Sequence, residues 1–346
     1  MSTVTTTPPA PAAGRSARNL VDMVFRAREL SLVAALVVLV GVTAVANSNF
    51  LSGQGVKDIL LNTSILALLA VGQSAVVMTR NIDLSVGSVV GLVAFTTGDF
   101  LSADHSRGIV SVVILGIAIG AACGLINGLL VSFCRVPALV VTLGTLYVIQ
   151  GVDYYLAHGR QINAVDLPPG LLDLGNGSVL GVPYLPLITV LIMLAMGFYL
   201  RSYPSGREFY AIGSSPEAAL LAGIPVRRRV LAAYLLSGAL AGLGGVLWLA
   251  RFGTVVADSA NGWELLVVSA VVVGGVAITG GVGSVYGATL GALLLTTIGS
   301  ALVVLRVNPF WQQAVTGALL LLAISVDRVL ALRVARLLRR RNVRRV

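Results

Sequence analysis

Long apolar runs, separated by short polar segments, make up most of the chain. Ten of these runs are long enough to cross a bilayer, whose hydrocarbon core takes about 20 residues of helix. They lie at residues 30–48, 58–78, 84–101, 109–133, 138–157, 183–200, 229–251, 264–280, 285–305 and 311–327. The pattern therefore predicts an all-α, polytopic membrane protein with about ten transmembrane helices.

The two ends of the chain depart from this pattern. Residues 1–29 open with small, polar and proline-rich sequence, which predicts a disordered leader. The first apolar run is as long as a full span, which favours an uncleaved helix over a removable signal peptide. Residues 328–346 form an arginine-rich tail. We therefore expect a transmembrane domain over residues 30–327, flanked by these two segments.

The positive charges are distributed unevenly over the loops. Charged residues make up 11% of the chain, against about 25% in soluble domains, and the net charge is +10. With both termini in the cytoplasm, nineteen of the 24 lysines and arginines fall in cytoplasmic segments, as the positive-inside rule requires. Eight of these arginines lie in the tail, where they suit anionic lipid better than nucleic acid. We expect cytoplasmic termini, contact with membrane lipid and no nucleic-acid partner.

Glycines recur every fourth residue in several predicted spans, at Gly116, Gly120, Gly124 and Gly128, at Gly238 and Gly242, and at Gly287 and Gly291. Small residues at this spacing form a ridge on one face of a helix, where two backbones can approach closely. The spacing therefore predicts tightly packed helices.

A short internal repeat links two distant segments. IDLSVGSVVG at 82–91 and ITGGVGSVYG at 278–287 share six of ten residues. Transporters are often built from such repeats. The predicted topology places both copies on the cytoplasmic side and so favours parallel copies, but an inverted repeat or a chance match stays open.

The segment 206–229, GREFYAIGSSPEAALLAGIPVRRR, breaks the apolar pattern within a cytoplasmic loop over residues 201–229. Its charged stems surround a short run of small and apolar residues. Such a segment would project from the membrane and could dock into a groove on another protein. Nothing in it supplies the groups that a catalytic site needs.

The ends of the short helix in this segment can be predicted from its capping residues. Ser215 followed by Pro216 is typical of a helix start. Ser214 and Glu217 have capping-box spacing, which is an alternative start one residue earlier. Gly223 predicts a left-handed stop. The result is a two-turn helix that is capped at both ends.

EAALLAG at 217–223 resembles the E-A-A-x-x-x-G loop of the permease subunits of ATP-binding cassette (ABC) importers, which seats in the ATPase subunit. The rhamnose permeases of the ribose/xylose/rhamnose branch look most similar, and autoinducer-2 permeases are near relatives. The blocks that carry this resemblance are NIDLSVGSV at 81–89, GLINGLLV at 124–131, PALVVTLGTL at 137–146, GREFYAIG at 206–213, SGALAGLGGVLWLARF at 237–252, ANGWELLVVSAVVVGG at 260–275 and GGVGSVYGATLGALL at 280–294.

The resemblance implies a permease subunit, and not an enzyme, of a binding-protein-dependent monosaccharide importer in the bacterial plasma (inner) membrane. It implies an ABC ATPase subunit, an extracytoplasmic sugar-binding protein and a second permease, either a copy or a paralogue, as partners. ATP and Mg would bind to the ATPase, and this chain would hold no cofactor; its only lysine, Lys57, is not in a Walker A loop. The residues implied in ATPase coupling are Gly206, Arg207, Gly213, Glu217, Ala218, Ala219 and Gly223.

Two features depart from the family pattern. Arg80-Asn81 stands where Gly-Gly often precedes I-D-L-S, which puts the tightness of that turn in doubt. The chain also lacks the I-x-L-P element that often follows the coupling loop, a change common in the sugar branch.

Polar residues within spans are costly and usually line a path or join helices. The candidates for the substrate path are Asn62, Gln73, Asp83, Ser85, Asn127, Thr142, Tyr147 and Gln150. Hydrogen bonding between helices is the alternative for each, and Asp83 also suits a structural role at a helix start. Candidates for contact with the binding protein, in a predicted outside loop, are Asp258, Asn261 and Glu264. We expect no metal site.

Other functions stay possible at this stage. A secondary transporter driven by an ion gradient would need buried ionisable residues, of which the spans hold few. A scaffold or sensor without transport is a third possibility. Rhamnose is the leading substrate by resemblance, with ribose, xylose and autoinducer-2 open.

Overall fold

The computed structural model describes residues 13–308 and, beyond them, residues 310, 311, 313–315, 317, 318, 321 and 325. The helices of the described part are α1 (Ala13–Ala46), α2 (Gly53–Met78), α3 (Val86–Ala103), α4 (Ile109–Ser132), α5 (Ala138–Ala157), α6 (Pro169–Asn176), α7 (Tyr184–Ser202), α8 (Pro204–Ser214), α9 (Pro216–Leu221), α10 (Val226–Phe252), α11 (Trp263–Val273) and α12 (Val285–Val304). Two short 3₁₀ helices, η1 (Ser48–Leu51) and η2 (Ala164–Asp166), and an antiparallel pair of strands, β1 (Ser178–Val179) and β2 (Val182–Pro183), complete the connections.

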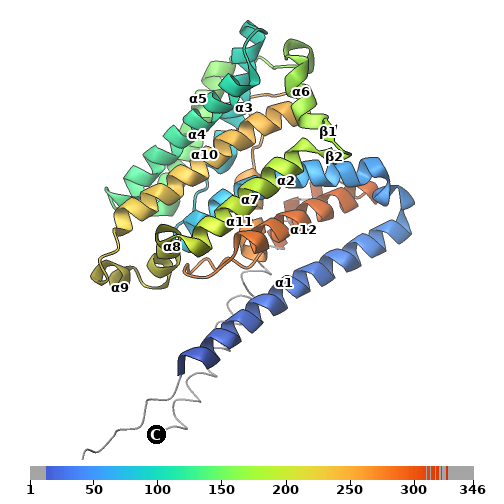
Figure 1. Cartoon of the computed structure of the whole chain (residues 1–346). Helices are drawn as coiled ribbons and strands as arrows, with labels where there is room; N and C mark the ends of the chain where they lie inside the picture. The colour runs from blue at the N-terminus through green and yellow to red at the C-terminus, as the bar shows by residue number, and fades with distance from the viewer. Residues whose placement is uncertain are drawn as a thin grey trace, which may run out of the picture.

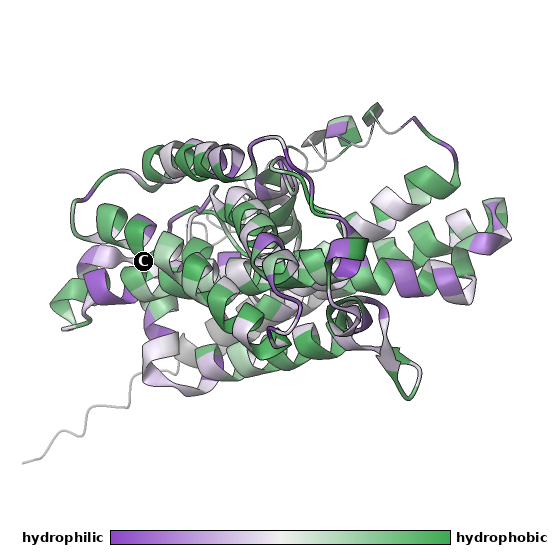
Figure 2. Cartoon of the chain, turned by 90° about the horizontal axis from the view of Figure 1, so that it is seen from above, coloured by the Kyte–Doolittle hydropathy of each residue, from purple (hydrophilic) through white to green (hydrophobic). Residues whose placement is uncertain are grey.

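Seven of these helices are long and apolar enough to cross a membrane, namely α2, α3, α4, α5, α7, α10 and α12. They confirm seven of the ten predicted spans, and the chain is a mostly helical, multi-pass membrane protein. Figure 2 shows hydrophobic residues along the helices and hydrophilic residues gathered toward the loops and helix ends. Of the three remaining spans, the one predicted at 311–327 lies largely outside the described residues.

Helix α1 starts earlier than the sequence pattern predicts. It begins at Ala13, so the helix includes residues 13–29. Alanine, arginine, leucine and methionine in this stretch are good helix formers, which accounts for the extension. Only its part Leu30–Ala46 is apolar enough to lie in a membrane. Residues 1–12 and the tail at 328–346 lie outside the described residues.

Helix α11 is shorter than the span predicted at 264–280, and that prediction is wrong. Its eleven residues reach about 16 Å, roughly half of the hydrocarbon core. The helix stops because Gly274 and Gly275 follow, and Gly275 has a left-handed φ of 97°. The chain stays apolar beyond this point, so hydropathy alone could not reveal the break.

Helix α2 is the centre of the bundle and is buried along most of its length, between α10, α12, α11 and α7. The glycine ridge of α4 packs against α10, as the glycine spacing predicted. A Cβ built on Gly120 would lie 2.2 Å from the carbonyl oxygen of Gly238, so the two backbones touch. Helix α1 lies along α12 at the edge of the bundle (Figure 1).

The two copies of the internal repeat lie side by side. The amide of Gly281 donates a hydrogen bond of 3.0 Å to the carbonyl oxygen of Met78, which joins the turns that begin the two copies. Each copy then provides the residue before a helix, Ser85 for α3 and Ser284 for α12. The turns that begin the two copies therefore meet beside Gly213.

Candidate functional site

Helices α8 and α9 lie at one end of the bundle, opposite α6 and the β1–β2 hairpin (Figure 1). Helix α9 has the predicted capping. The Ser215 hydroxyl accepts a hydrogen bond of 3.3 Å from the amide of Ala218, and Pro216 follows as the first helical residue. Gly223 has φ of 80° and ends the helix. Ser215 is therefore the N-cap, and the alternative start at Ser214 is not used.

The exposed surface of α9 is more apolar than the sequence suggested. Glu217 and Ala218 are exposed as expected, but Ala219 is buried beneath the helix. Leu220 and Leu221 are 66% and 90% exposed, although leucines of a short helix are usually assumed to face inward. No local signal distinguishes the exposed leucines from buried ones, because a two-turn helix is too short to show a clear periodicity.

Helix α8 holds α9 against the bundle, which the sequence did not predict. Phe209 and Ile212 are buried, and the Tyr210 hydroxyl donates a hydrogen bond of 3.2 Å to the Gly283 carbonyl oxygen. Burial raises the pKa of Tyr210 to about 12. Arg229 of α10 forms an ion pair with Glu208. The projecting helix is therefore mounted on a second helix that is fixed to two other parts of the chain.

Two of the predicted coupling glycines, Gly206 and Gly213, are buried in α8, while Gly223 and Arg207 are exposed. A Cβ built on Gly206 would lie 2.4 Å from the carbonyl oxygen of Tyr199. A Cβ on Gly213 would lie 1.9 Å from the Met78 carbonyl oxygen and 2.1 Å from the Gly281 amide nitrogen. Gly213 thus sits between the two repeat turns, at the point where α8 leads into α9.

Arg80 joins the turn after α2 to the end of α8. Its Nε donates to the carbonyl oxygen of Gly213 at 2.5 Å, and its Nη2 donates to that of Ser214 at 2.7 Å. Arg80 has φ of 66°, the left-handed conformation that favours glycine. Arg80 therefore holds a backbone conformation that costs a non-glycine residue some strain, and its side chain adds two hydrogen bonds to the segment ahead of α9.

A buried polar cluster, which we call the Asp83 cluster, consists of Asp83, Ser85, Asn127 and Ser237. The Ser85 hydroxyl and amide donate to Asp83 Oδ1 at 2.7 and 3.0 Å, and Asn127 Nδ2 donates to Ser85 Oγ at 2.8 Å. The Ser237 hydroxyl donates to Asp83 Oδ2 at 3.4 Å, at the outer limit of a hydrogen bond. Burial raises the pKa of the Asp83 carboxyl, and the hydrogen bonds from Ser85 partly offset this.

The cluster ties the α2–α3 connection to three helices. Besides Asn127 of α4 and Ser237 of α10, the Thr142 hydroxyl of α5 donates to the Ile82 carbonyl oxygen at 3.3 Å, and Tyr234 of α10 does so at 3.2 Å. Four predicted path residues, Asp83, Ser85, Asn127 and Thr142, are thus brought together.

The remaining path candidates lie elsewhere. Tyr147 is 70% exposed on α5 and does not face the bundle interior. Gln73 of α2 is fully buried, and neither polar atom of its amide has a partner within the described residues. Asn62 is partly buried, and its Oδ1 also lacks a partner there. These positions do not form one path with the Asp83 cluster.

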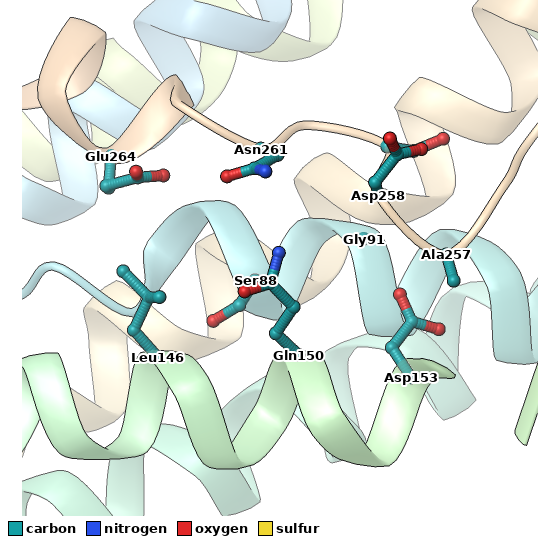
Figure 3. A pocket seen from close by; sticks show the side chains of 10 residues that line it. Ser88, Gly91, Leu146, Gln150, Asp153, Ala257, Asp258, Asn261 and Glu264 are labelled. Carbon is teal, nitrogen blue, oxygen red and sulfur yellow. The ribbon is translucent and has the colours of Figure 1, made fainter. Parts of the chain in front are cut away.

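The last candidate, Gln150, lines a separate polar pocket together with residues that the sequence placed in a distant loop (Figure 3). The polar pocket lies between α3, α5 and the connection from α10 to α11. It is lined by Ser88, Gly91, Leu146, Gln150, Asp153, Ala257, Asp258, Ser259, Asn261 and Glu264. Asp153 was not among the predicted site residues.

The segment between α10 and α11 reaches this pocket because it folds back onto the bundle. Val255 donates to the Ile162 carbonyl oxygen at 3.0 Å, and Ala260 is buried. A Cβ built on Gly87, in the first turn of α3, would lie 2.5 Å from Glu264 Oε2. Asp258, Asn261 and Glu264 therefore border α3 and α5 as well as the surface, and do not lie in a simple outside loop.

A family model described as the branched-chain amino acid transport system / permease component matches residues 55–324. The chain belongs to this family of permeases. The permease is 37% identical over 300 residues to the autoinducer 2 import system permease protein LsrC of Enterobacter sp. (strain 638), covering 87% of this chain and 86% of that protein. It is 35% identical over 318 residues to LsrC of Yersinia pseudotuberculosis serotype O:3 (strain YPIII), covering 92% and 90%.

No solved structure matches the permease. Both relatives are named as autoinducer 2 permeases, the group that the sequence analysis gave as near relatives of the rhamnose permeases. The family assignment makes the chain a membrane transport subunit of the ABC importer type.

Proposed function

We propose that this permease is the translocating subunit of a binding-protein-dependent ABC importer for a small hydroxylated solute of the monosaccharide type. The observation that carries the proposal is the way α9 is held. This exposed helix is capped at both ends, and the helix that supports it, α8, packs between the two repeat turns at Gly213. A separate ATPase subunit, which binds ATP and Mg, would engage the exposed surface of α9. The transporter would reside in the bacterial inner membrane.

Movement of α9 would reach the membrane through Gly213. The two turns that enclose this glycine lead to the Asp83 cluster and α3 on one side, and to α11 on the other. Helices α3 and α11 both begin beside the polar pocket. Discontinuous helices around a buried polar site are typical of transporters that work by alternating access. Closure of the ATPase subunits would thus be transmitted to the elements that surround this pocket.

Autoinducer-2 is the first substrate to test, because the relatives at 37% and 35% identity are autoinducer 2 permeases. Rhamnose stays a second candidate, since the blocks at 237–252 and 260–275 resemble rhamnose permeases. Ribose and xylose complete the panel.

Two further partners belong to the proposal. An extracytoplasmic binding protein would deliver the substrate, and Asp258, Asn261 and Glu264 remain predicted contacts for it. A second permease, identical or paralogous, would complete the transporter, since each ATPase of a pair needs its own docking helix.

The role of α9 can be tested with Glu217→Lys and Gly223→Pro. Both residues are exposed, so the buried bundle should still fold and insert. Proline cannot adopt the φ of 80° at Gly223, so Gly223→Pro should distort only the end of α9. We expect ATP-dependent uptake and copurification of the ATPase subunit to be lost. Arg135→Glu is the control, since it reverses an exposed charge in the α4–α5 connection. Uptake by both variants at the level of the control would remove the coupling role of α9.

A further inference from the structure

The polar pocket contains groups that the fold does not use. Asp153 is 1% exposed, points into the pocket in Figure 3, and its Oδ1 has no hydrogen-bond partner within the described residues. The side-chain amides of Gln150 and Asn261 also make no hydrogen bond in the part of the chain that the structure describes. Gln150 is half-buried and Asn261 is exposed, so water can reach their amides, but Asp153 is buried. Buried polar groups in native proteins are normally paired, so the unpartnered carboxylate oxygen of Asp153, beside two free amides in one pocket, indicates a ligand.

The charges around the pocket disfavour an anion. Asp153, Asp258 and Glu264 contribute three carboxylates, and none of the described lining residues is lysine or arginine. The starts of α3 and α11 carry partial positive charge, which alone would attract an anion. Glu264 occupies that position, because it lies in the first turn of α11 and against Gly87 in the first turn of α3.

The remaining groups match hydroxyls. A hydroxyl group both donates and accepts hydrogen bonds, and each free amide offers an acceptor oxygen and a donor NH2 group for these two roles. Ser88 already donates to the Ser85 carbonyl oxygen at 2.8 Å, so its oxygen is left to accept. A protonated amine could donate to the carboxylates and to the carbonyl oxygens of Gln150 and Asn261. It has no acceptor, so the NH2 groups of both amides would stay without a partner. A neutral polyol satisfies the carboxylates and the amides together.

The pocket is contracted in this conformation. A water-sized sphere can occupy about 10 Å³ of it, which is room for about one water. A Cβ built on Gly91 would lie 2.7 Å from the Ser259 carbonyl oxygen, so the connection before α11 presses directly on α3. A sugar-sized solute could enter only if this connection moved away. The same connection continues through α11 to the Gly281 turn beside Gly213, which links its position to α9.

We infer that the polar pocket is the substrate site of the permease, and that it takes an uncharged polyhydroxylated solute while rejecting its phosphate ester. In this site Asp153 accepts a hydrogen bond from a solute hydroxyl, and the amides of Gln150 and Asn261 orient the solute. The inference rests on the proposed transport function, but it can be tested without ATP, ATPase or binding protein.

The test measures protection of a cysteine in the pocket. Ala257→Cys is introduced into the full chain after Cys123→Ser and Cys134→Ser, and the labelling rate by N-ethylmaleimide is followed in membrane vesicles. The probes are autoinducer-2, rhamnose, ribose, ribose 5-phosphate and glucosamine. We expect at least one neutral probe to slow labelling about tenfold when saturating, and ribose 5-phosphate to leave the rate unchanged.

Asp153→Asn on the same background should raise the concentration needed for protection by about tenfold or more, the effect of losing a hydrogen bond to a charged group. Asp104→Asn, which removes an exposed carboxylate outside the pocket, should leave it unchanged. The inference would be overturned if no probe protected the cysteine, if the phosphate ester protected it equally well, or if glucosamine protected it best. It would also be overturned if Asp153→Asn left the protecting concentration unchanged. If uptake occurs while protection fails, only the site is refuted; protection without uptake refutes the importer and not the site.

Discussion

Gly120→Ala tests the close contact between α4 and α10. The added Cβ would lie 2.2 Å from the Gly238 carbonyl oxygen and 2.6 Å from the Gly242 amide nitrogen, where ordinary contacts begin near 3.4 Å. Both neighbours are backbone atoms, so no side chain can turn away and the helices must separate by about 1 Å. Overpacking of this kind costs about 3 kcal/mol, while alanine gains about 1 kcal/mol over glycine as a helix former. The net destabilisation is about 2 kcal/mol.

The assay is thermal unfolding of the purified permease in detergent, followed by the fraction that stays monodisperse. The unfolding entropy of a 346-residue chain is about 0.7 kcal/mol/K, so a loss of about 2 kcal/mol should lower the apparent Tm by about 3 °C. Gly144→Ala is the matched control, because Gly144 lies within α5 and a Cβ added there would meet no neighbouring atom of the described structure within 4 Å. It should keep or slightly raise the Tm. Equal Tm values for the two variants would refute the backbone contact.

Three further changes test the connection from α9 into the membrane. Arg80→Gly loses two hydrogen bonds but relieves about 1 kcal/mol of left-handed backbone strain, so the stability of the permease should hold. In a reconstituted transport assay, the amount of solute moved per ATP should fall severalfold. Arg135→Gly is the control, because Arg135 is also left-handed but exposed, and it should leave transport unchanged. Asn127→Leu removes the buried amide that donates to Ser85 Oγ at 2.8 Å and to Asp83 Oδ1 at 3.5 Å, which should cost about 2 kcal/mol in thermal unfolding; an unchanged Tm would contradict this. Gly213→Ala should abolish uptake by vesicles, because the added Cβ would meet the backbone of Met78 on one side and of Gly281 on the other. Normal uptake would refute the close packing of α8 between these two turns.

Much of the architecture follows from local sequence signals. Seven spans are apolar over a full bilayer thickness, so hydropathy finds them. The α9 caps depend on residues within one turn of each helix end, and these can be read directly from Ser215 and Gly223. The glycine ridge is a periodic signal that needs no knowledge of its partner.

What could not be predicted depends on contacts between distant segments. Gln150 and Asn261 share a pocket only because the connection before α11 folds back onto α3, and no local pattern encodes that return. The clamp from Arg80 to Gly213 joins residues 133 positions apart. The α11 break was missed because its glycines lie inside a run that remains apolar on average.

The central claim is best tested by solute uptake into vesicles that contain the permease with its ATPase subunit and binding protein. Labelled autoinducer-2, rhamnose, ribose and xylose would be supplied with ATP, without ATP, and with an uncoupler. The account predicts uptake of one of these solutes that requires both ATP and the binding protein and survives the uncoupler. Uptake that proceeds without ATP and collapses with the uncoupler would contradict the account and indicate an ion-coupled transporter.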